Sequence, residues 1–519
     1  MTKLNLMKLE PQFLEDMDRL IRSGQHSVAR QSLLLIPLKT IERDQKTAVA
    51  DLARRLNMPK VMIAVLRDVV FNTKQLLNPA THHERALYAV ALARLGVFKE
   101  AEQRMTELKG EGYLEADFYL AQNHMLQWQY SKAIPFLKNH LKRADLSEYQ
   151  TLVGQVNLVS SYQGNSDWSE SRNLLTLVMK SLQNKISQIP DGKEYSLLYG
   201  NCLEQAAFQE IFNGRIEMAE VWLMEAQKLL GGSQSRYELF VKKWSAILRI
   251  LKPSADSDSF AKFEQFRKDV HKSKNWETIR ELDFYLALAK KDESLFWKVF
   301  FGTPFLQYRK RIQSLFKPDS RPLKFQWQSQ IVDQSKIDRT LDLSRGEEIG
   351  SKVQIRSNAI LHQLLQILCR DFYRPVALGA IFSELFPNEH YDPDSSPQRV
   401  YQSIIRLRKW FRDHHVPLRI TSSNWSFRLK FTGNYAVQIQ MKADRTSELE
   451  FPIEKLVENF GMNPFSAKAV SEKFDIPLSR AQKYLSEVLK LKKIRKTAGG
   501  SVTKYKLVES VVKRKDRPY

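Results

Sequence analysis

Helical periodicity dominates the chain from residue 1 to about residue 304, where apolar residues recur at steps of three and four in almost every window. A loose repeat runs through it: a turn, an aromatic or apolar residue, a small residue three positions later, and apolar residues four and seven positions after that. The small residues Ala29, Ala64, Ala101 and Ala133 are spaced by 35, 37 and 32 residues, close to one helix-turn-helix unit. Ala219 marks a later, stretched unit. The pattern predicts an all-helical array over residues 1–304.

This repeat resembles a degenerate tetratricopeptide (TPR) motif. The resemblance implies an α-solenoid whose curved faces commonly bind peptides or partner helices. Tyr88, Tyr119 and Tyr162 are candidate partner-facing aromatics, but aromatics dominate core burial and the core interpretation is favoured. A purely structural or dimerising helical domain stays open as an alternative.

After residue 304 the pattern changes to short elements. Prolines and a Gln-rich stretch predict a linker over residues 305–337. Short strands are then expected at 340–343 and 352–355, a helix from Ser357, a second helix over 378–386, and a third over 396–415. Two strands, 418–421 and 426–429, flank a tight turn at Asn424.

The helix predicted over 396–415 carries the strongest functional signal. Its apolar stripe consists of Val400, Ile404, Leu407 and Phe411, and no acid occurs before Asp413. Arg can pair with guanine edges, Gln with adenine, and Lys with phosphate, so such a helix suits a DNA major groove. An ordinary basic surface helix is the alternative. The polar side holds Gln398, Arg399, Gln402, Arg406 and Lys409.

The order of elements over residues 338–431 resembles the OmpR/PhoB-type winged-helix domain, most specifically from Arg374 to Phe411. In that family the third helix enters the major groove and the hairpin wing reaches the minor groove. The chain departs from the family at Ser423, Asn424 and Ser426, where the family usually has an Arg and two glycines, so the wing is expected to touch only the DNA backbone. The resemblance implies base-facing Gln398, Arg399, Gln402, Ser403 and Arg406, phosphate-facing Lys409, and wing contacts from Trp425 and Arg428.

A second module is expected at the C-terminal end. Residues 432–451 are a predicted connection with a strand at 435–441, and residues 452–510 show three helices followed by a hairpin turning at Gly499–Gly500. This order resembles a generic MarR-like winged helix, and whether it contacts DNA or protein stays open. A basic tail, 511–519, follows. The candidate contact residues are Ser479, Arg480, Gln482, Lys483, Lys496 and Lys504.

Charge supports a polyanionic partner. The 519-residue chain has a net charge of +23, and residues 301–519 hold 39 basic against 22 acidic residues, a net of +17. The only cysteines, Cys202 and Cys369, are far apart, which excludes a disulfide scaffold. The sequence has no P-loop, dinucleotide-binding glycine pattern, HExxH motif or nucleophile elbow, and the adjacent pairs His82–His83 and His414–His415 do not have metal-ligand spacing. A non-enzymatic protein without metal or cofactor is expected.

Together these patterns predict a mainly α protein: a TPR-like α-solenoid followed by two small α+β winged-helix domains. From the winged-helix resemblance and the basic charge we expect a bacterial-type transcriptional regulator. We expect it to be cytoplasmic, because no segment suits a membrane span or secretory signal. Its expected partners are double-stranded DNA and a protein or peptide bound by the array; a homodimer is left open. The alternative is a non-catalytic interaction scaffold whose winged helices bind protein or RNA.

Overall fold

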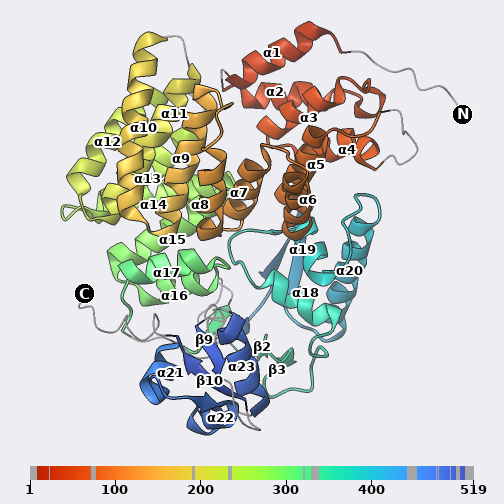
Figure 1. Ribbon diagram of the computed structural model, residues 1–519, viewed down its shortest axis with the longest axis vertical. Coiled ribbons are helices and arrows are strands. Elements are labelled where there is room, and N and C mark those ends of the chain that lie inside the picture. Colours follow the sequence, from red (N-terminus) through yellow and green to blue (C-terminus); the bar gives the residue numbers. More distant parts are fainter. Residues whose placement is uncertain are drawn as a thin grey trace, which may run out of the picture. The chain divides into compact units, whose positions relative to one another are not determined.

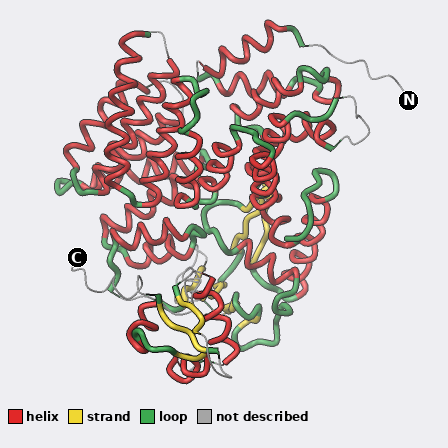
Figure 2. The backbone as a smooth tube through the Cα atoms, viewed as in Figure 1, coloured by secondary structure: helices red, strands yellow, loops and turns green. Residues whose placement is uncertain are grey.

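The computed structural model describes most of the chain and divides it into two compact units, residues 1–439 and 440–519 (Figure 1). Helices predominate, and the strands are short and confined to the part of the chain after residue 323 (Figure 2). This confirms the mainly α prediction. The described residues are 9–22, 24–71, 78–189, 193–231, 236–319, 322–328, 337, 339–440, 453–474, 476, 478–490, 493–497 and 503–508.

The first part of unit 1, residues 9–317, is a run of helices, here called the helical region. The helices are α1 Pro11–Arg22, α2 His26–Leu34, α3 Lys46–Arg55, α4 Pro59–Val70, α5 His82–Arg94, α6 Phe98–Gly110, α7 Ala116–Leu126, α8 Tyr130–His140, α9 Glu148–Asn165, α10 Trp168–Gln188, α11 Lys193–Phe212, α12 Ile216–Leu230, α13 Arg236–Leu251, α14 Ser257–Lys272, α15 Trp276–Lys290, α16 Glu293–Phe301 and α17 Leu306–Leu315, with a 3₁₀ turn at Leu38–Thr40. From α3 to α16, each helix packs against the next one in the sequence.

The repeat in the sequence has a physical basis in this region. The fourth residue of α2, α6, α8 and α12 is a fully buried alanine, which lets a neighbouring helix approach closely. The prediction that Ala64 is the equivalent small residue in α4 is wrong. Ala64 is exposed, and the fourth residue of α4 is the buried Met62. Ala64 is the residue type that the repeat requires, but it lies two residues after the buried position and therefore on another side of the helix.

The candidate partner-facing aromatics of the helical region belong to the core. Tyr88, Tyr119 and Tyr162 are all buried, and burial raises the pKa of Tyr88 and Tyr119 well above the ordinary tyrosine value. These side chains therefore contribute packing, as aromatics most often do.

The segment expected to be a linker, residues 305–337, contains a helix and a strand in its described part. It contains α17, whose Tyr308 and Ile312 are buried, and strand β1 (Lys324–Gln328). The ring of Trp327 in β1 stacks on Phe372 with centroids 4.2 Å apart. The linker prediction failed because the partners that bury this segment lie far away in the sequence.

Residues 339–439, here called the first three-helix region, follow β1. A four-stranded sheet has the order β1-β7-β2-β3, with β2 and β7 parallel and Leu341 opposite Val437. A three-stranded sheet has the order β4-β6-β5. Residues 352–355 form only an isolated bridge rather than the expected strand, and the first helix begins at Ile360 rather than Ser357. The elements are β2 Arg339–Asp342, β3 Glu347–Glu348, α18 Ile360–Leu368, β4 Val376–Ala377, α19 Leu378–Leu385, α20 Ser396–Asp413, β5 Leu418–Ser423, β6 Ser426–Phe431 and β7 Tyr435–Gln440.

The helical region and the first three-helix region share one hydrophobic core, so the predicted boundary between them does not separate compact units. Helix α19 packs on α6. The approach needs a glycine, because a Cβ at Gly379 would lie 2.5 Å from the carbonyl oxygen of Leu95. Nearby, the backbone N–H of Tyr391 donates to Glu100 at 2.7 Å.

Unit 2 contains the second three-helix region, described over residues 453–508 with gaps. Its sheet order is β8-β10-β9. Its own core includes Leu456, Val470, Tyr484, Leu485 and Leu507. The elements are α21 Ile453–Phe460, β8 Phe465–Ser466, α22 Ala467–Phe474, α23 Leu478–Lys490, β9 Ile494–Thr497 and β10 Lys504–Leu507. The predicted turn at Gly499–Gly500, the tail 511–519 and most of the connection 432–451 beyond β7 lie outside the described residues.

Candidate nucleic-acid interface

Helix α20 is seated by the apolar stripe that the sequence predicts. Val400, Ile404, Leu407 and Phe411 are all buried, and they pack in the shared core of unit 1. Their i, i+4, i+7, i+11 spacing keeps them on one side of the helix, so the opposite side faces away from the core.

The start of α20 is fixed by local hydrogen bonds. One carboxylate oxygen of Asp392 accepts from the backbone N–H groups of Asp394 and Ser395, at 2.8 and 3.0 Å. These backbone hydrogen bonds lower the pKa of Asp392, and nearby Arg67 of α4 contributes. Pro397 in the first turn has a fixed φ suited to helix initiation. Arg67 also forms an ion pair with Asp394, so the helical region holds the loop that leads into α20.

The end of α20 is tied to the four-stranded sheet. Arg339 in β2 donates from one guanidinium nitrogen to the carbonyl oxygen of His415 at 2.8 Å. Its other nitrogens bind the carboxylate of Glu348 at 2.8 Å, which also accepts from the hydroxyl of Tyr435 at 3.0 Å. Anchors at both ends make α20 a rigid platform for the side chains on its outer face.

Four of the predicted contact residues are presented on that outer face. Gln398, Gln402, Arg406 and Lys409 are exposed, and none of them has a hydrogen-bond or ion-pair partner within the described part of the chain. The face thus offers two amides, a guanidinium and an ammonium to solvent, the groups that pair with adenine, guanine and phosphate.

Two other predicted contact residues behave differently. Ser403 was expected to face bases, and this is wrong: it is buried, and its hydroxyl donates to the carbonyl oxygen of Arg399 at 3.1 Å. It lies at the edge of the apolar stripe, where a small residue fits against the core. Arg399 is partly exposed but forms an ion pair with Glu389, and its guanidinium lies 3.9 Å from the ring centroid of Phe386.

The outer face also carries an apolar residue that the sequence analysis missed. Ile405 is 52% exposed and lies three residues after Gln402 and four before Lys409, which places it between them on the helix surface. Tyr401, on the flank, is also exposed. Helical spacing alone could have predicted this exposure. Ile405 follows Ile404 of the buried stripe and is therefore rotated from it by about 100° around the helix axis.

The hairpin formed by β5 and β6 turns through two residues with left-handed backbone. Asn424 has φ +47° and Trp425 has φ +59°, and Ser423 pairs with Ser426. A two-residue turn with positive φ at both positions matches the twist of a hairpin. The tight turn expected at Asn424 is therefore confirmed.

The hairpin is engaged with other parts of unit 1. Arg428 in β6 donates to the carbonyl oxygen of Phe372 at 2.7 Å, and its guanidinium lies 5.2 Å from the ring centroid of Trp276 in α15. Burial lowers the pKa of Arg428. The ring of Trp425, 36% exposed, has the ammonium of Lys60 in α4 at 4.1 Å from its centroid. The expected DNA contacts of Arg428 and Trp425 are corrected accordingly: in this structure both side chains contact the helical region.

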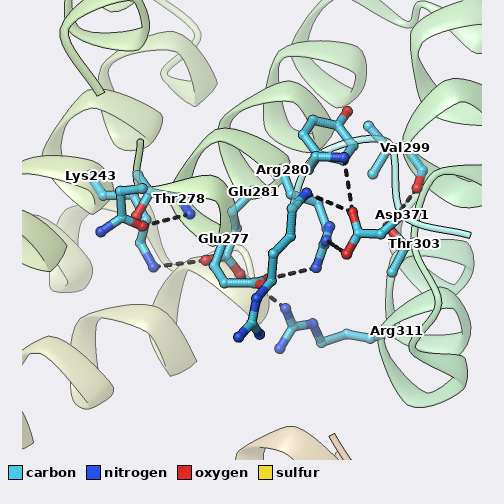
Figure 3. Close-up of polar contacts among 12 residues, drawn as sticks. Lys243, Glu277, Thr278, Arg280, Glu281, Val299, Thr303, Arg311 and Asp371 are labelled. Atoms are coloured by element: carbon cyan, nitrogen blue, oxygen red, sulfur yellow. Dashed lines mark hydrogen bonds and ion pairs between the residues drawn. The ribbon is translucent and has the colours of Figure 1, made fainter. Parts of the chain in front are cut away.

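A buried network of charged groups joins α15 to the segment before β4 (Figure 3). Arg280 is 1% exposed; one guanidinium nitrogen donates to Glu277 and another to Asp371, both at 2.6 Å. Burial alone would lower the pKa of Arg280, but the carboxylates of Glu277 and Asp371 outweigh it and raise the pKa. The second oxygen of Asp371 accepts from the backbone N–H groups of Tyr373 and Arg374, both at 2.9 Å.

A second carboxylate on α15 extends this network. Asp283 accepts a hydrogen bond from the hydroxyl of Tyr373 at 2.8 Å and pairs with Arg267 at 2.6 Å. Two residues earlier, Glu281 pairs with Lys243 at 2.7 Å and Arg311 at 3.0 Å (Figure 3). Because paired buried charges are costly to separate, this network fixes the first three-helix region to α15, and it fixes α15 to α13 and α17.

The second three-helix region presents its predicted contact residues where they are described. Ser479 and Gln482 of α23 are exposed, as are Lys496 of β9 and Lys504 of β10. The side chains of Arg480 and Lys483, also on α23, lie outside the described residues. The hairpin places Arg495 directly opposite Lys506, an unfavourable pairing of like charges that an anion would relieve.

Other chemistry finds little support in the described residues. No cluster of three or more His, Cys, Asp or Glu side chains suitable for a metal ion occurs among them. Burial raises the pKa of Cys202 to about 12 and raises that of Cys369 further, so neither thiol is activated. No described helix combines the length and apolarity that crossing a membrane requires. Comparisons with protein-family models, curated proteins and solved structures found no match for this chain.

Proposed function

We propose that this protein is a non-catalytic, DNA-binding transcriptional regulator of the bacterial, cytoplasmic type. In this proposal the first three-helix region is an OmpR/PhoB-like winged helix that reads duplex DNA with α20. The second is a MarR-like winged helix, and the helical region is a TPR-like array that receives a partner protein.

One observation carries this proposal: the outer face of α20. Gln402 and Arg406 are exposed and unpaired within the described residues, on a helix anchored at both ends. Unpaired polar groups on a rigid helix need little rearrangement to meet base edges, which favours a recognition role over an ordinary surface helix. The excess of basic residues after residue 300 supports an anionic partner.

The proposal is tested on the full-length chain. A duplex enriched from a random pool by repeated binding and amplification is compared with random duplex by fluorescence anisotropy at several salt concentrations. We expect Arg406→Ala to weaken binding to the enriched duplex by about 1–3 kcal/mol and binding to random duplex by less, because a guanine contact is lost.

Arg19→Ala is the matched control, since it removes a guanidinium that is 74% exposed on α1, far along the chain from α20. It should change neither affinity. Failure to enrich any sequence, or equal losses on both duplexes for Arg406→Ala, would contradict base reading by α20.

A second function has support from the first hairpin. Because Arg428 and Trp425 contact the helical region, this hairpin adds little to a DNA surface in the observed arrangement. The alternative is an interaction scaffold in which the same folds bind protein or RNA. Competition of the labelled duplex with double-stranded RNA of the same sequence separates the cases: RNA competing as well as DNA would favour the alternative.

A further inference from the structure

Helices α12 and α13 enclose a groove of about 420 Å³ on the helical region. They are consecutive and pack against each other. Helix α12 contributes residues at i, i+3, i+4 and i+7, and α13 together with the residue that follows it has the same spacing, so the groove follows one surface row of each helix for about two turns. Its walls comprise Glu220, Leu223, Met224, Gln227 and Lys228 from α12, Ser245, Leu248 and Arg249 from α13, and Lys252 directly after α13.

The groove is apolar at its base and along one side. Leu223 and Leu248 are buried beneath it, while Met224 is 58% exposed. The apolar surface continues along α12 through Met218 and Val221, both exposed. Methionine is flexible and polarizable, which suits a surface that must adapt to a partner side chain.

Two basic residues without ion-pair partners in the described part of the chain line this groove. Lys228 and Arg249 are exposed, and neither has an ion-pair partner within the described part of the chain. Lys252 is paired with Glu220, at 2.7 and 2.8 Å to its two oxygens. After that pair is neutralised, two cations remain at the groove with no carboxylate opposing them among its lining residues.

We propose that this groove is a docking site for an acidic amphipathic helix of a partner protein. A groove two turns long matches an incoming helix that inserts apolar residues at i, i+3 or i+4, and i+7. Carboxylates flanking those residues would meet Lys228 and Arg249, and complementary charge selects the partner. The inference specifies the partner-binding role within the proposed function, but it does not require that the protein bind DNA.

The test uses the full-length chain and three fluorescein-labelled 18-residue peptides, without DNA. The first has leucines at helical spacing and glutamates elsewhere; the second replaces the glutamates with lysines; the third is a scramble of the first that removes its apolar stripe. We expect the acidic peptide to bind at least tenfold more tightly than the other two in anisotropy titrations. Lys228→Glu combined with Arg249→Glu should reverse the preference between the acidic and basic peptides.

Met224→Asp should also reduce binding of the acidic peptide about tenfold or more, whereas Leu177→Asp should leave it unchanged. Leu177, on α10, is the matched control because it is 64% exposed and does not line the groove. Circular dichroism checks that each variant keeps the helical content of the parent. Equal binding of the acidic and scrambled peptides, or binding insensitive to the α12 and α13 variants, would overturn the inference while leaving the DNA-binding proposal intact.

Discussion

From the first helix to the hairpin, the two three-helix regions have the same order of elements, but their surroundings differ. Each has a helix, a short strand, two more helices and a hairpin, and the sheet orders β4-β6-β5 and β8-β10-β9 are equivalent. The first shares its core with the helical region, whereas the second has a core of its own in a separate compact unit.

The hairpins of the two regions differ in what their basic side chains contact. In the first, Arg428 is used in contacts with Phe372 and Trp276. In the second, Lys496 and Lys504 are exposed and have no ion-pair partner among the described residues. We therefore expect the two regions to make different DNA contacts. The first three-helix region would contact bases through α20, and the second would contact phosphates through its hairpin.

The largest expected effect comes from breaking the attachment of the first region. Asp371→Ala leaves Arg280 buried with one carboxylate fewer, and removal of one partner from a buried ion pair costs about 3–5 kcal/mol. Calorimetry of the full chain should show the transition of unit 1 shifted to lower temperature and that of unit 2 unchanged. Asp371→Leu combined with Arg280→Met and Glu277→Gln should recover part of the loss, because all three charges of the buried cluster are then removed together. Equal shifts of both transitions would contradict the separation into two units.

A smaller effect is expected from the second hairpin. Lys496→Glu combined with Lys504→Glu should weaken binding to specific and random duplexes alike and reduce the slope of log affinity against log salt concentration by about 2, as expected for two lost phosphate contacts. Anisotropy titrations from low to moderate salt measure the slope. A loss confined to the enriched duplex would mean that this hairpin reads bases, and no loss would remove the second region from the interface.

On α20, Ile405→Ser sharpens the assignment of base contacts. An exposed apolar side chain between Gln402 and Lys409 can contact a thymine methyl group. We expect about 1 kcal/mol of lost discrimination at one base pair, within the range for a single mismatched position. Affinities for duplexes with thymine or uracil at each position measure it, because uracil lacks only the methyl group. A parent chain that does not distinguish the two at any position would refute this contact.

The smallest effect is expected for Trp425→Ala. Because its ring contacts Lys60, its loss should change DNA affinity by less than about 0.5 kcal/mol, as for a surface substitution. Anisotropy with the enriched duplex checks this. A tenfold loss would show that the first hairpin leaves the helical region when DNA binds.

Local signals predicted α20 and its hairpin well from the sequence. The helix expected over 396–415 spans Ser396–Asp413, and the strands around Asn424 differ from expectation by two residues at their ends. Apolar spacing and turn residues are contained within each segment, so they identify it directly.

Contacts between distant segments could not be predicted in the same way. Nothing in the sequence around Arg428 indicates that Trp276, some 150 residues earlier, lies against it. Likewise α17 and β1 fold within an expected linker because Phe372 and the helices before them provide cover. Ser403 was wrongly predicted to face DNA bases for another reason. Its polar side chain suggested exposure, but its position on the helix places it beside the core.

The two carboxylate oxygens of Asp371 bind different parts of unit 1, and this limits where the chain can be truncated. One oxygen holds the turn that begins the short strand before α19, and the other holds a guanidinium from the helical region. Cutting the chain between residues 304 and 338 and removing the helical region would leave the Asp371 carboxylate without Arg280. A cut after β1 would also remove Trp327, which stacks on Phe372. Helix α20 is therefore not part of a module that can be cut free, and a truncation that abolishes DNA binding would report the loss of this support as readily as the loss of a recognition surface.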